Sequence, residues 1–310
     1  MSDFITHLVT ELKQKKGVTD TTAAAYLRTL IQLNDRRPFT SLAFLRKKDA
    51  IDAKIAHYAE STQKTVLGAI TSVLSLFSDR TTFKTLHKHY YEKMMSKAKE
   101  QKPTGEKSEK QKENWIEWKD VVEKNAEQRK QMASLAEKKS LTQKEMDEVL
   151  QALVLSLYVC IQPRRNQDYL DMVVVKKWSE ELPKDKNYLD LTGERFIFNK
   201  YKTAKKYGKQ EVPIPVELLD VLVAYLKHHP FYKQSKSAVP FLINAKGEPL
   251  TAVNSITRLL NKMFKKKLGS SMLRHIFLTD KYGEQKNEMA EDAEAMGHSV
   301  AEQQNIYVLH

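Results

Sequence analysis

Residues 141–168 read LTQKEMDEVLQALVLSLYVCIQPRRNQD, and this stretch determines how the second half of the chain folds. Thr142 followed by Glu145 forms a capping box, which predicts that a helix begins there. The apolar residues that follow predict one strongly apolar helix running to about Ile161. This run is far too short to span a bilayer, which takes about 20 apolar residues, so we expect no membrane partner.

The rest of this half combines short strands with helices. Residues 188–191, 195–201 and 210–214 have the pattern of short strands, and the last two face each other across the basic loop 202–209. Apolar periodicity predicts helices at about 216–228, 253–267, 271–282, 287–296 and 300–308. We therefore expect a mainly α chain in which residues 141–310 form an α+β domain with a small antiparallel sheet.

The first hundred residues read as helices only. Their apolar positions recur three and four residues apart, and no strand-like alternation is present. The predicted helices are 4–15, 21–34, 50–60, 63–77 and 83–97. Residues 1–100 are therefore expected to form a compact helical domain of their own.

Residues 101–140 differ in composition from both neighbours. They carry 10 basic and 8 acidic side chains, with Pro103 and Gly105 near the start. This composition predicts a charged linker and places the domain boundary here. Trp115, Ile116 and Trp118 indicate that the linker is partly helical and packs against another part of the protein.

The chain is strongly basic. Its 52 Lys and Arg residues against 39 Asp and Glu give a net charge of +13, which is the sign expected of a protein that binds phosphate. Residues 1–100 hold the largest share of the excess, with 17 basic and 10 acidic side chains. A solvated face is the ordinary alternative for such runs. The side chains predicted to bind DNA are Arg36, Arg37, Arg46, Lys47, Lys48, Lys84 and Lys88.

Cysteine usage and the N-terminal residues indicate the compartment. The single cysteine, Cys160, lies inside the apolar run, so it is expected to be a buried thiol in a reducing environment. The first residues lack the basic and apolar regions of a secretory signal. We expect an intracellular protein that meets DNA in the cytoplasm or the nucleus.

Several familiar catalytic motifs are missing from the sequence. It has no Gly-rich phosphate loop, no His-Glu-x-x-His and no Gly-x-Ser-x-Gly. No convincing acidic cluster for two-metal phosphoryl transfer is present either. We therefore expect chemistry on phosphate that uses no metal and no cofactor.

The second half supplies cations and a nucleophile in a particular order. Arg165 is followed one turn later by Asp168, and Lys202 ends a predicted strand. Further on come Arg274, His298 and Tyr307. Each of these residues alone is more simply explained as part of a surface, a loop or a packed helix. The order Arg, Lys, Arg, His, Tyr is the feature that points to chemistry.

With these residues and their surroundings, the chain resembles the tyrosine recombinases, the phage-integrase family of DNA strand-exchange enzymes. The resemblance covers most of residues 141–310. The segment at Arg165 is similar to the family's Gly-Leu-Arg-x-x-Glu, with Asp168 at the acidic place. Lys202 matches the hairpin lysine, and Leu273-Arg274-His275 matches the second arginine box. Gly297-His298-Ser299 followed by Tyr307 matches the segment of the nucleophile.

The resemblance implies a fold and a reaction. The helical first domain is similar to the family's core-binding domain, which closes around the duplex. The protein is then a site-specific recombinase that integrates or excises DNA through a 3′-phosphotyrosyl intermediate, without metal or ATP. The partner is double-stranded DNA, on which the family assembles homo-oligomers, here a tetramer. Residues 163–166 and 201–203 also resemble integrases of viruses and mobile elements.

The same resemblance assigns roles to the residues. Tyr307 is the nucleophile, and Arg165 and Arg274 bind the non-bridging phosphate oxygens, to which His298 adds a hydrogen bond. Lys202 is the general acid that protonates the leaving 5′ oxygen. Asp168 orients Arg165.

Two departures from the family pattern bear on this assignment. Ser271 stands where the family usually has histidine, and a hydroxyl can donate to phosphate but does not exchange a proton near neutral pH. Only three residues follow Tyr307, where these recombinases often have a further helix that docks into a neighbouring subunit. Ser271 is therefore not expected to take the proton of the nucleophile, and subunits are expected to assemble through other surfaces or by exchange of the nucleophile segment itself.

Two other functions remain open at this point. A type IB DNA topoisomerase has the same chemistry but acts as a monomer and does not join two sites. A DNA-binding protein whose catalytic site has decayed would keep the basic surface without the reaction.

Overall fold

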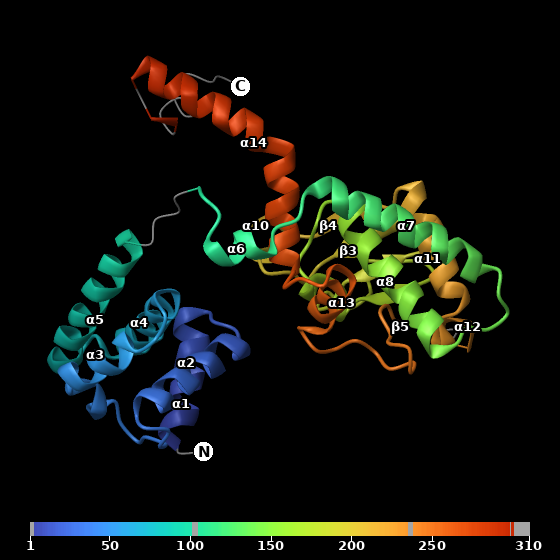
Figure 1. Ribbon diagram of the computed structural model, residues 1–310. Helices are drawn as coiled ribbons and strands as arrows, with labels where there is room; N and C mark the ends of the chain where they lie inside the picture. Colours follow the sequence, from blue (N-terminus) through green and yellow to red (C-terminus); the bar gives the residue numbers. More distant parts are fainter. Residues whose placement is uncertain (1–2, 101–104, 235–237, 298, 301–310) are drawn as a thin grey trace. The chain divides into compact units, whose positions relative to one another are not determined.

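The computed structural model describes residues 3–100, 105–234, 238–297 and 299–300 (Figure 1). The chain divides into two compact units, Met1–Glu106 and Lys107–His310. In the part that is described, no helix combines the length and the apolarity needed to cross a bilayer. The chain is mainly helical, with one small mixed sheet in the second unit.

The first unit is a helical domain, as the sequence predicts. Each predicted helix is present, with ends within a few residues of those expected. The helices are α1 (Asp3–Lys16), α2 (Asp20–Leu33), α3 (Lys48–Ala56), α4 (Glu60–Leu74) and α5 (Thr81–Glu100), with short 3₁₀ turns η1 (Ala43–Arg46) and η2 (Ser75–Phe77).

Helix α4 holds this unit together because it is buried along much of its length. Val66, Ile70 and Val73 lie in the core and pack between α5 and α2. The hydroxyl of the buried Tyr90 on α5 donates to the backbone oxygen of Leu45, at 3.0 Å. The apolar cluster and this hydrogen bond fix the short connections that carry many of the basic side chains.

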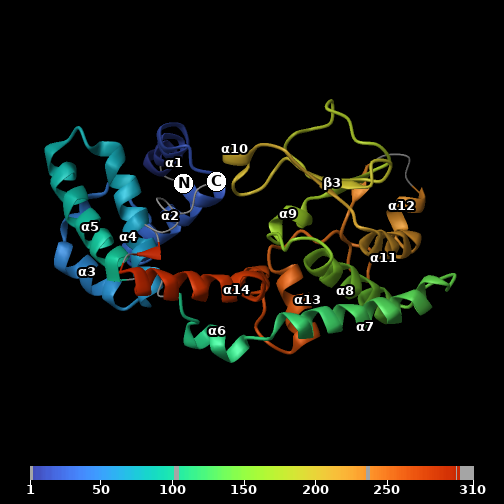
Figure 2. The same ribbon diagram turned by 90° about the horizontal axis from the view of Figure 1, so that it is seen from above.

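The second unit is organised around α8 (Gln143–Val159), in which every residue from Val149 to Tyr158 is buried. Figures 1 and 2 show its neighbours in this unit, and contacts join α8 to each of them. They are α7 (Trp118–Ala136), α11 (Val216–Lys227) and α13 (Ser255–Phe264).

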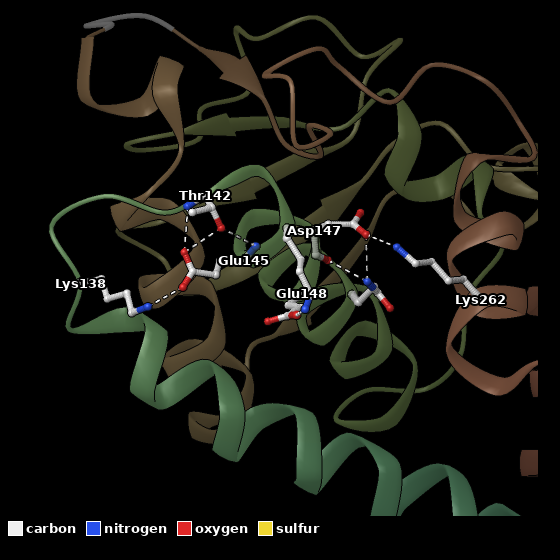
Figure 3. Close-up of polar contacts among 8 residues, drawn as sticks. Lys138, Thr142, Glu145, Asp147, Glu148 and Lys262 are labelled. Carbon is white, nitrogen blue, oxygen red and sulfur yellow. Dashed lines mark hydrogen bonds and ion pairs between the residues drawn. The ribbon is translucent and has the colours of Figure 1, made fainter.

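The capping box predicted at the start of α8 is confirmed (Figure 3). The backbone N–H of Glu145 donates to the Thr142 hydroxyl at 3.3 Å, and the backbone N–H of Thr142 donates to the Glu145 carboxylate at 2.8 Å. The ion pair with Lys138, together with the bonds from Thr142, lowers the pKa of Glu145 to about 2. Lys262 of α13 pairs with Asp147, so α13 is tied to the same end of α8.

The predicted linker differs from the structure over most of its length. Two helices lie within residues 101–140, α6 (Glu109–Asn114) and α7, and both belong to the second unit. Val121, Met132 and Leu135 of α7 join the core around α8, and buried Asn125 donates to Ser156 at 2.8 Å. The expectation that this segment is partly helical and packs on another part of the protein agrees with these contacts, and its helical part is longer than expected because the exposed charges of α7 dominate the composition.

The sheet contains the three predicted strands and two short ones that were missed. Its order is β4-β3-β2-β1-β5, and β1 runs parallel to β2, so the expectation of an antiparallel sheet is wrong. The missed strands are too short to give a periodic signal. The strands are β1 (Val173–Val175), β2 (Tyr188–Asp190), β3 (Arg195–Phe198), β4 (Gln210–Pro213) and β5 (Val239–Pro240).

Short helices lie in the connections of this unit. They are α9 (Gln167–Leu170), α10 (Ala204–Tyr207) and α12 (Pro230–Gln234). Figure 2 shows the connection between β3 and β4, with α10, reaching out from the sheet. The basic loop 202–209 predicted between two strands is this connection.

One helix replaces two that were predicted near the end. Residues 271–282 and 287–296 belong to a single continuous helix, α14 (Ser270–Met296), which passes through Gly283 without a break. A lone glycine lowers helix propensity by only about 1 kcal/mol, so the residues around it can keep the helix intact. Of the predicted helix 300–308, only residue 300 is among those described.

Buried His229 predicts how stability depends on pH. Its Nδ1 accepts from the backbone N–H of Tyr232 at 3.2 Å, and its Nε2 lies 3.0 Å from the oxygen of Pro240, which fits the neutral ring. Burial lowers the pKa of His229. Below a pH of about 6.5, the ring therefore binds a proton in the unfolded chain but stays neutral in the folded chain. The second unit should therefore lose stability as the pH falls below about 6.5.

Urea unfolding at a series of pH values checks this, followed by tryptophan fluorescence because Trp115, Trp118 and Trp178 all lie in the second unit. His229→Gln should flatten the pH dependence. The control His275→Gln changes an exposed ring and should leave it unchanged. Identical profiles for His229→Gln and the unaltered chain would contradict the prediction.

Candidate active site

Asn166 connects three helices of the second unit next to Arg165. It is buried in the turn between α8 and α9. Its side-chain oxygen accepts from the hydroxyl of Tyr158 on α8 at 2.7 Å, and its amide nitrogen donates to Thr257 on α13 at 2.9 Å. Its backbone N–H donates to the hydroxyl of Ser270, the first residue of α14, at 3.4 Å. The segment that carries Arg165 is thus bonded directly to the start of α14.

Arg274 lies one turn after Ser270 on the same face of α14, and it is half-buried. Burial, with Tyr169 and Asp168 nearby, raises the pKa of the Tyr158 hydroxyl, and the charge of Arg274 opposes that rise. A pocket of about 200 Å³ is lined by Gln162 and Pro163 on one side and by residues of α14, including Arg274, on the other. Arg274 therefore faces the segment that contains Arg165.

The hairpin that carries Lys202 is joined to the same segment. Arg164 donates to Gln210 of β4 at 2.9 Å, and its guanidinium lies 3.7 Å from the centre of the Phe198 ring on β3. Asn187 donates to the backbone oxygens of Asp168 and Lys200, at 2.8 and 2.9 Å. Lys202, which follows shortly after Lys200, begins the exposed part of the hairpin.

The structure gives Asp168 a different partner from the one expected. Its carboxylate accepts from Nε of Arg164 at 3.1 Å, whereas no side-chain bond joins it to Arg165. Burial raises the pKa of Asp168, and the charges of Arg164 and Arg165 oppose the rise. The ion-pair partner of Asp168 is therefore Arg164, while Arg165 acts on the same carboxylate through its charge and its backbone. That Asp168 orients Arg165 stays a prediction.

The three cations that the sequence singled out have no competing partner among the described residues. Arg165 and Arg274 are half-buried and Lys202 is exposed, and the side chains of the three form no hydrogen bond or ion pair within the described ranges. Such side chains are available to an anion. His298 and Tyr307 lie outside the described residues, so the structure does not place them.

Ser271 and Ser270 have different environments. Ser271, at the position where the family usually has histidine, is exposed, whereas Ser270 is buried and accepts from Asn166. Sequence reasoning missed Ser270, Asn166 and Arg164. The sequence held no signal for Arg164, because only the folded turn distinguishes it from Arg165.

In the first unit, the side chains predicted to bind DNA are mostly exposed. Only Lys48 is half-buried, and only Lys88 pairs with a carboxylate, that of Glu92 at 3.9 Å. Arg46 lies over the ring of Phe83, at 5.8 Å, which brings it to the start of α5. The residues in question are Arg36, Arg37, Arg46, Lys47, Lys48, Lys84 and Lys88.

Two of these cations gather around one carboxylate. The ion pair with Lys54 lowers the pKa of Asp35, and the charges of Arg37 and Lys47 lower it further. Arg37 and Lys47 are therefore close in space although η1 separates them in sequence.

Comparison with known proteins identifies no relative. No protein family matches the chain, and no curated protein or solved structure is similar to it. Function must therefore be argued from the residues and geometry of this chain.

The Tyr158–Asn166 bond predicts a measurable stability difference. Tyr158→Phe leaves the buried oxygen of Asn166 without this donor, and the second unit should lose about 1–3 kcal/mol of unfolding free energy. Tyr201→Phe is the matched control, because the Tyr201 hydroxyl donates to Gly208 on the surface, and its loss should stay below about 1 kcal/mol. Urea unfolding followed by tryptophan fluorescence measures both. Equal losses in the two variants would show that Asn166 has another donor.

Proposed function

We propose that the chain is a DNA strand-exchange enzyme of the tyrosine recombinase type, which cuts and rejoins strands through Tyr307. The observation that carries the proposal is the convergence of three segments far apart in sequence. Asn166 bonds the Arg165 segment to the start of α14, which bears Arg274, and Arg164 bonds it to the hairpin of Lys202. The three cations have no ion-pair partner among the described residues.

The chemistry of these side chains fits phosphodiester transesterification. Two guanidiniums can each bind the non-bridging oxygens of a phosphodiester, which gain charge as the phosphorus becomes five-coordinate. Removing one such donor typically costs about 3 kcal/mol of transition-state stabilisation. Arg165 and Arg274 supply this charge without titrating, and His298 would add a hydrogen bond.

The remaining roles concern protons. The hydroxyl of tyrosine has a pKa of about 10, so Tyr307 needs a positive environment to act as a nucleophile. Lys202 protonates the leaving 5′ oxygen as a general acid. The phosphotyrosyl bond conserves the energy of the broken linkage, so religation requires no ATP.

The biological reaction is proposed as integration or excision of a viral or mobile genome at specific sites. Such a reaction joins two duplexes, and it requires a homo-tetramer on DNA in the cytoplasm or the nucleus. The basic first unit would hold the duplex, and the second unit would perform the chemistry.

Covalent capture tests the proposal. The full chain is incubated with a library of nicked, randomised duplexes, in which a short strand diffuses away after cleavage and prevents religation. We expect a covalent protein–DNA adduct whose phosphorylated residue is Tyr307 by mass spectrometry. Tyr307→Phe should abolish the adduct, whereas Tyr232→Phe, at an exposed position on α12, should not.

The outcomes separate the alternatives. Sequencing the captured DNA gives the target, and joining of two such sites supports a recombinase. Relaxation of supercoiled DNA without joining would instead identify a type IB topoisomerase. Absence of any adduct from the whole library would leave a DNA-binding protein without the reaction.

The basic face of the first unit predicts steep salt dependence. Each phosphate contact contributes about 0.9 to the slope of log affinity against log salt. Arg37→Gln combined with Lys47→Gln should lower that slope by about 2, measured by fluorescence anisotropy on a duplex between 50 and about 200 mM KCl. The control changes Lys13 and Lys15 to Gln, because these lysines already pair with Asp20 and Glu11. An equal change in both double variants would place the DNA elsewhere.

A further inference from the structure

We infer that Arg164 is a positioning residue that holds the Lys202 hairpin against the Arg165 segment and so determines where the general acid stands. The inference rests on the proposed function, in which Lys202 protonates the leaving oxygen. Arg164 stands at the place where the related family motif has leucine, so this role belongs to the present chain.

The guanidinium of Arg164 is engaged on several sides at once. Its Nε donates to Asp168 at 3.1 Å, and its Nη1 donates to Gln210 at 2.9 Å. One face stacks on Phe198, with 3.7 Å between the guanidinium carbon and the ring centre, and Tyr201 lies 5.1 Å away. Only 16% of the side chain is exposed. Because these contacts are all with protein groups, the Arg164 side chain has a positioning role and does not bind the phosphate.

The contacts of Arg164 lie on both strands of the hairpin. Phe198 ends β3, just before Lys202, and Gln210 begins β4, just after the exposed connection. Phe198 and Gln210 are also paired across the two strands. Arg164 therefore contacts both strands of the hairpin, at the end from which the connection with Lys202 extends. The hydrogen bond from Arg164 to Asp168 joins the hairpin to α9, in which Asp168 lies.

Arg164 and Arg165 have different roles. The charge of Arg164 is matched by the carboxylate of Asp168, which is 3% exposed. The side chain of Arg165 has no hydrogen bond or ion pair among the described residues and stays available to the phosphate. Loss of the Arg164 contacts would release the hairpin while leaving the phosphate-binding cations in place.

The bond changes of the cleavage step show what such a release would do. The oxygen of Tyr307 forms a bond to phosphorus, the bond from phosphorus to the 5′ oxygen breaks, and Lys202 gives its proton to that oxygen. If sulfur replaces the 5′ bridging oxygen, the leaving group is a thiolate, which is stable without a proton. A defect confined to the general acid therefore disappears on the sulfur substrate, whereas a defect in phosphate binding remains.

Single-turnover cleavage of the captured target duplex, with either oxygen or sulfur at the bridging position, tests the inference. Arg164→Lys keeps a charge for Asp168 but cannot also reach Gln210 or cover Phe198. We expect it to slow cleavage of the oxygen substrate on the order of 100-fold, because a small misplacement of a catalytic group costs about that much. Cleavage of the sulfur substrate should stay close to that of the unaltered chain.

Gln210→Leu is the second variant, since it keeps the Arg164–Asp168 pair and removes only the bond to β4. Gln210→Leu should also slow cleavage of the oxygen substrate and not of the sulfur substrate, but by a smaller factor. This variant tests the inference even if Arg164→Lys folds poorly. Lys202→Met should show the defect in full. Combining Lys202→Met with Gln210→Leu should add nothing further, because both changes act through the same proton transfer.

Arg195 provides a matched control. It donates to Asp190 at 3.2 Å and to Glu211 of β4 at 2.6 Å, and it lies 5.9 Å from the Trp178 ring, so its bonding pattern repeats that of Arg164 away from the site. Arg195→Lys should lower the stability of the second unit without changing the ratio of the two cleavage rates.

Three results would overturn the inference. Equal slowing of both substrates by Arg164→Lys and Gln210→Leu would assign Arg164 to phosphate binding or to the fold. A selective defect in Arg195→Lys would show that any loosening of the sheet has this effect. Failure of the unaltered chain to form an adduct with any duplex would refute the proposed function itself, and the role of Arg164 in it.

Discussion

The buried ion pair between Arg164 and Asp168 is the interaction on which the arrangement of the second unit's site depends. Removing water from two charges is costly, and breaking such a pair by deleting one partner typically costs about 3–5 kcal/mol. Here the cost of burial is offset by Gln210 and by stacking on Phe198. Once the sheet and α9 have formed, Arg164 and Asp168 have few other charged partners within reach. The turn between α8 and α9 therefore has a defined conformation.

That conformation explains how the neighbouring residues are placed. With Arg164 turned toward the sheet, Asn166 is buried on the side of α13 and α14, where it bonds to Thr257 and Ser270. The side chain of Arg165, between them, forms no hydrogen bond or ion pair among the described residues. The short segment from Arg164 to Asn166 thus connects the hairpin, α8, α13 and α14. A change in one of these contacts should alter the others, because all of them involve the same short segment.

Sequence reasoning could predict the parts of this structure that depend on local patterns. The helices of the first unit and the capping box at Thr142 follow from apolar spacing and one polar signature, and the structure confirms them. The partner of Asp168 could not be predicted, because Arg164 and Arg165 differ only in the direction that the folded turn gives them. Strand β1 was missed because its three residues pair with strands that lie more than ten residues away in sequence, β2 and β5. The order of Arg165, Lys202 and Arg274 was visible in the sequence, whereas their convergence required the tertiary contacts of Asn166 and Arg164.

The start of α14 adds a further positive contribution to this region. Its first turn contains no acidic residue, and no side chain caps it, in contrast to α8, where Thr142 and Glu145 satisfy the first backbone N–H groups. Unsatisfied N–H groups at a helix start carry partial positive charge and favour an anion. Arg274 lies one turn further along the same helix, so its charge and that of the helix end have the same sign. Cations and helix ends of one sign repel one another, and a bound phosphate would relieve that repulsion while satisfying the exposed donors. Under the proposed function, this positive charge would favour the binding of a phosphodiester.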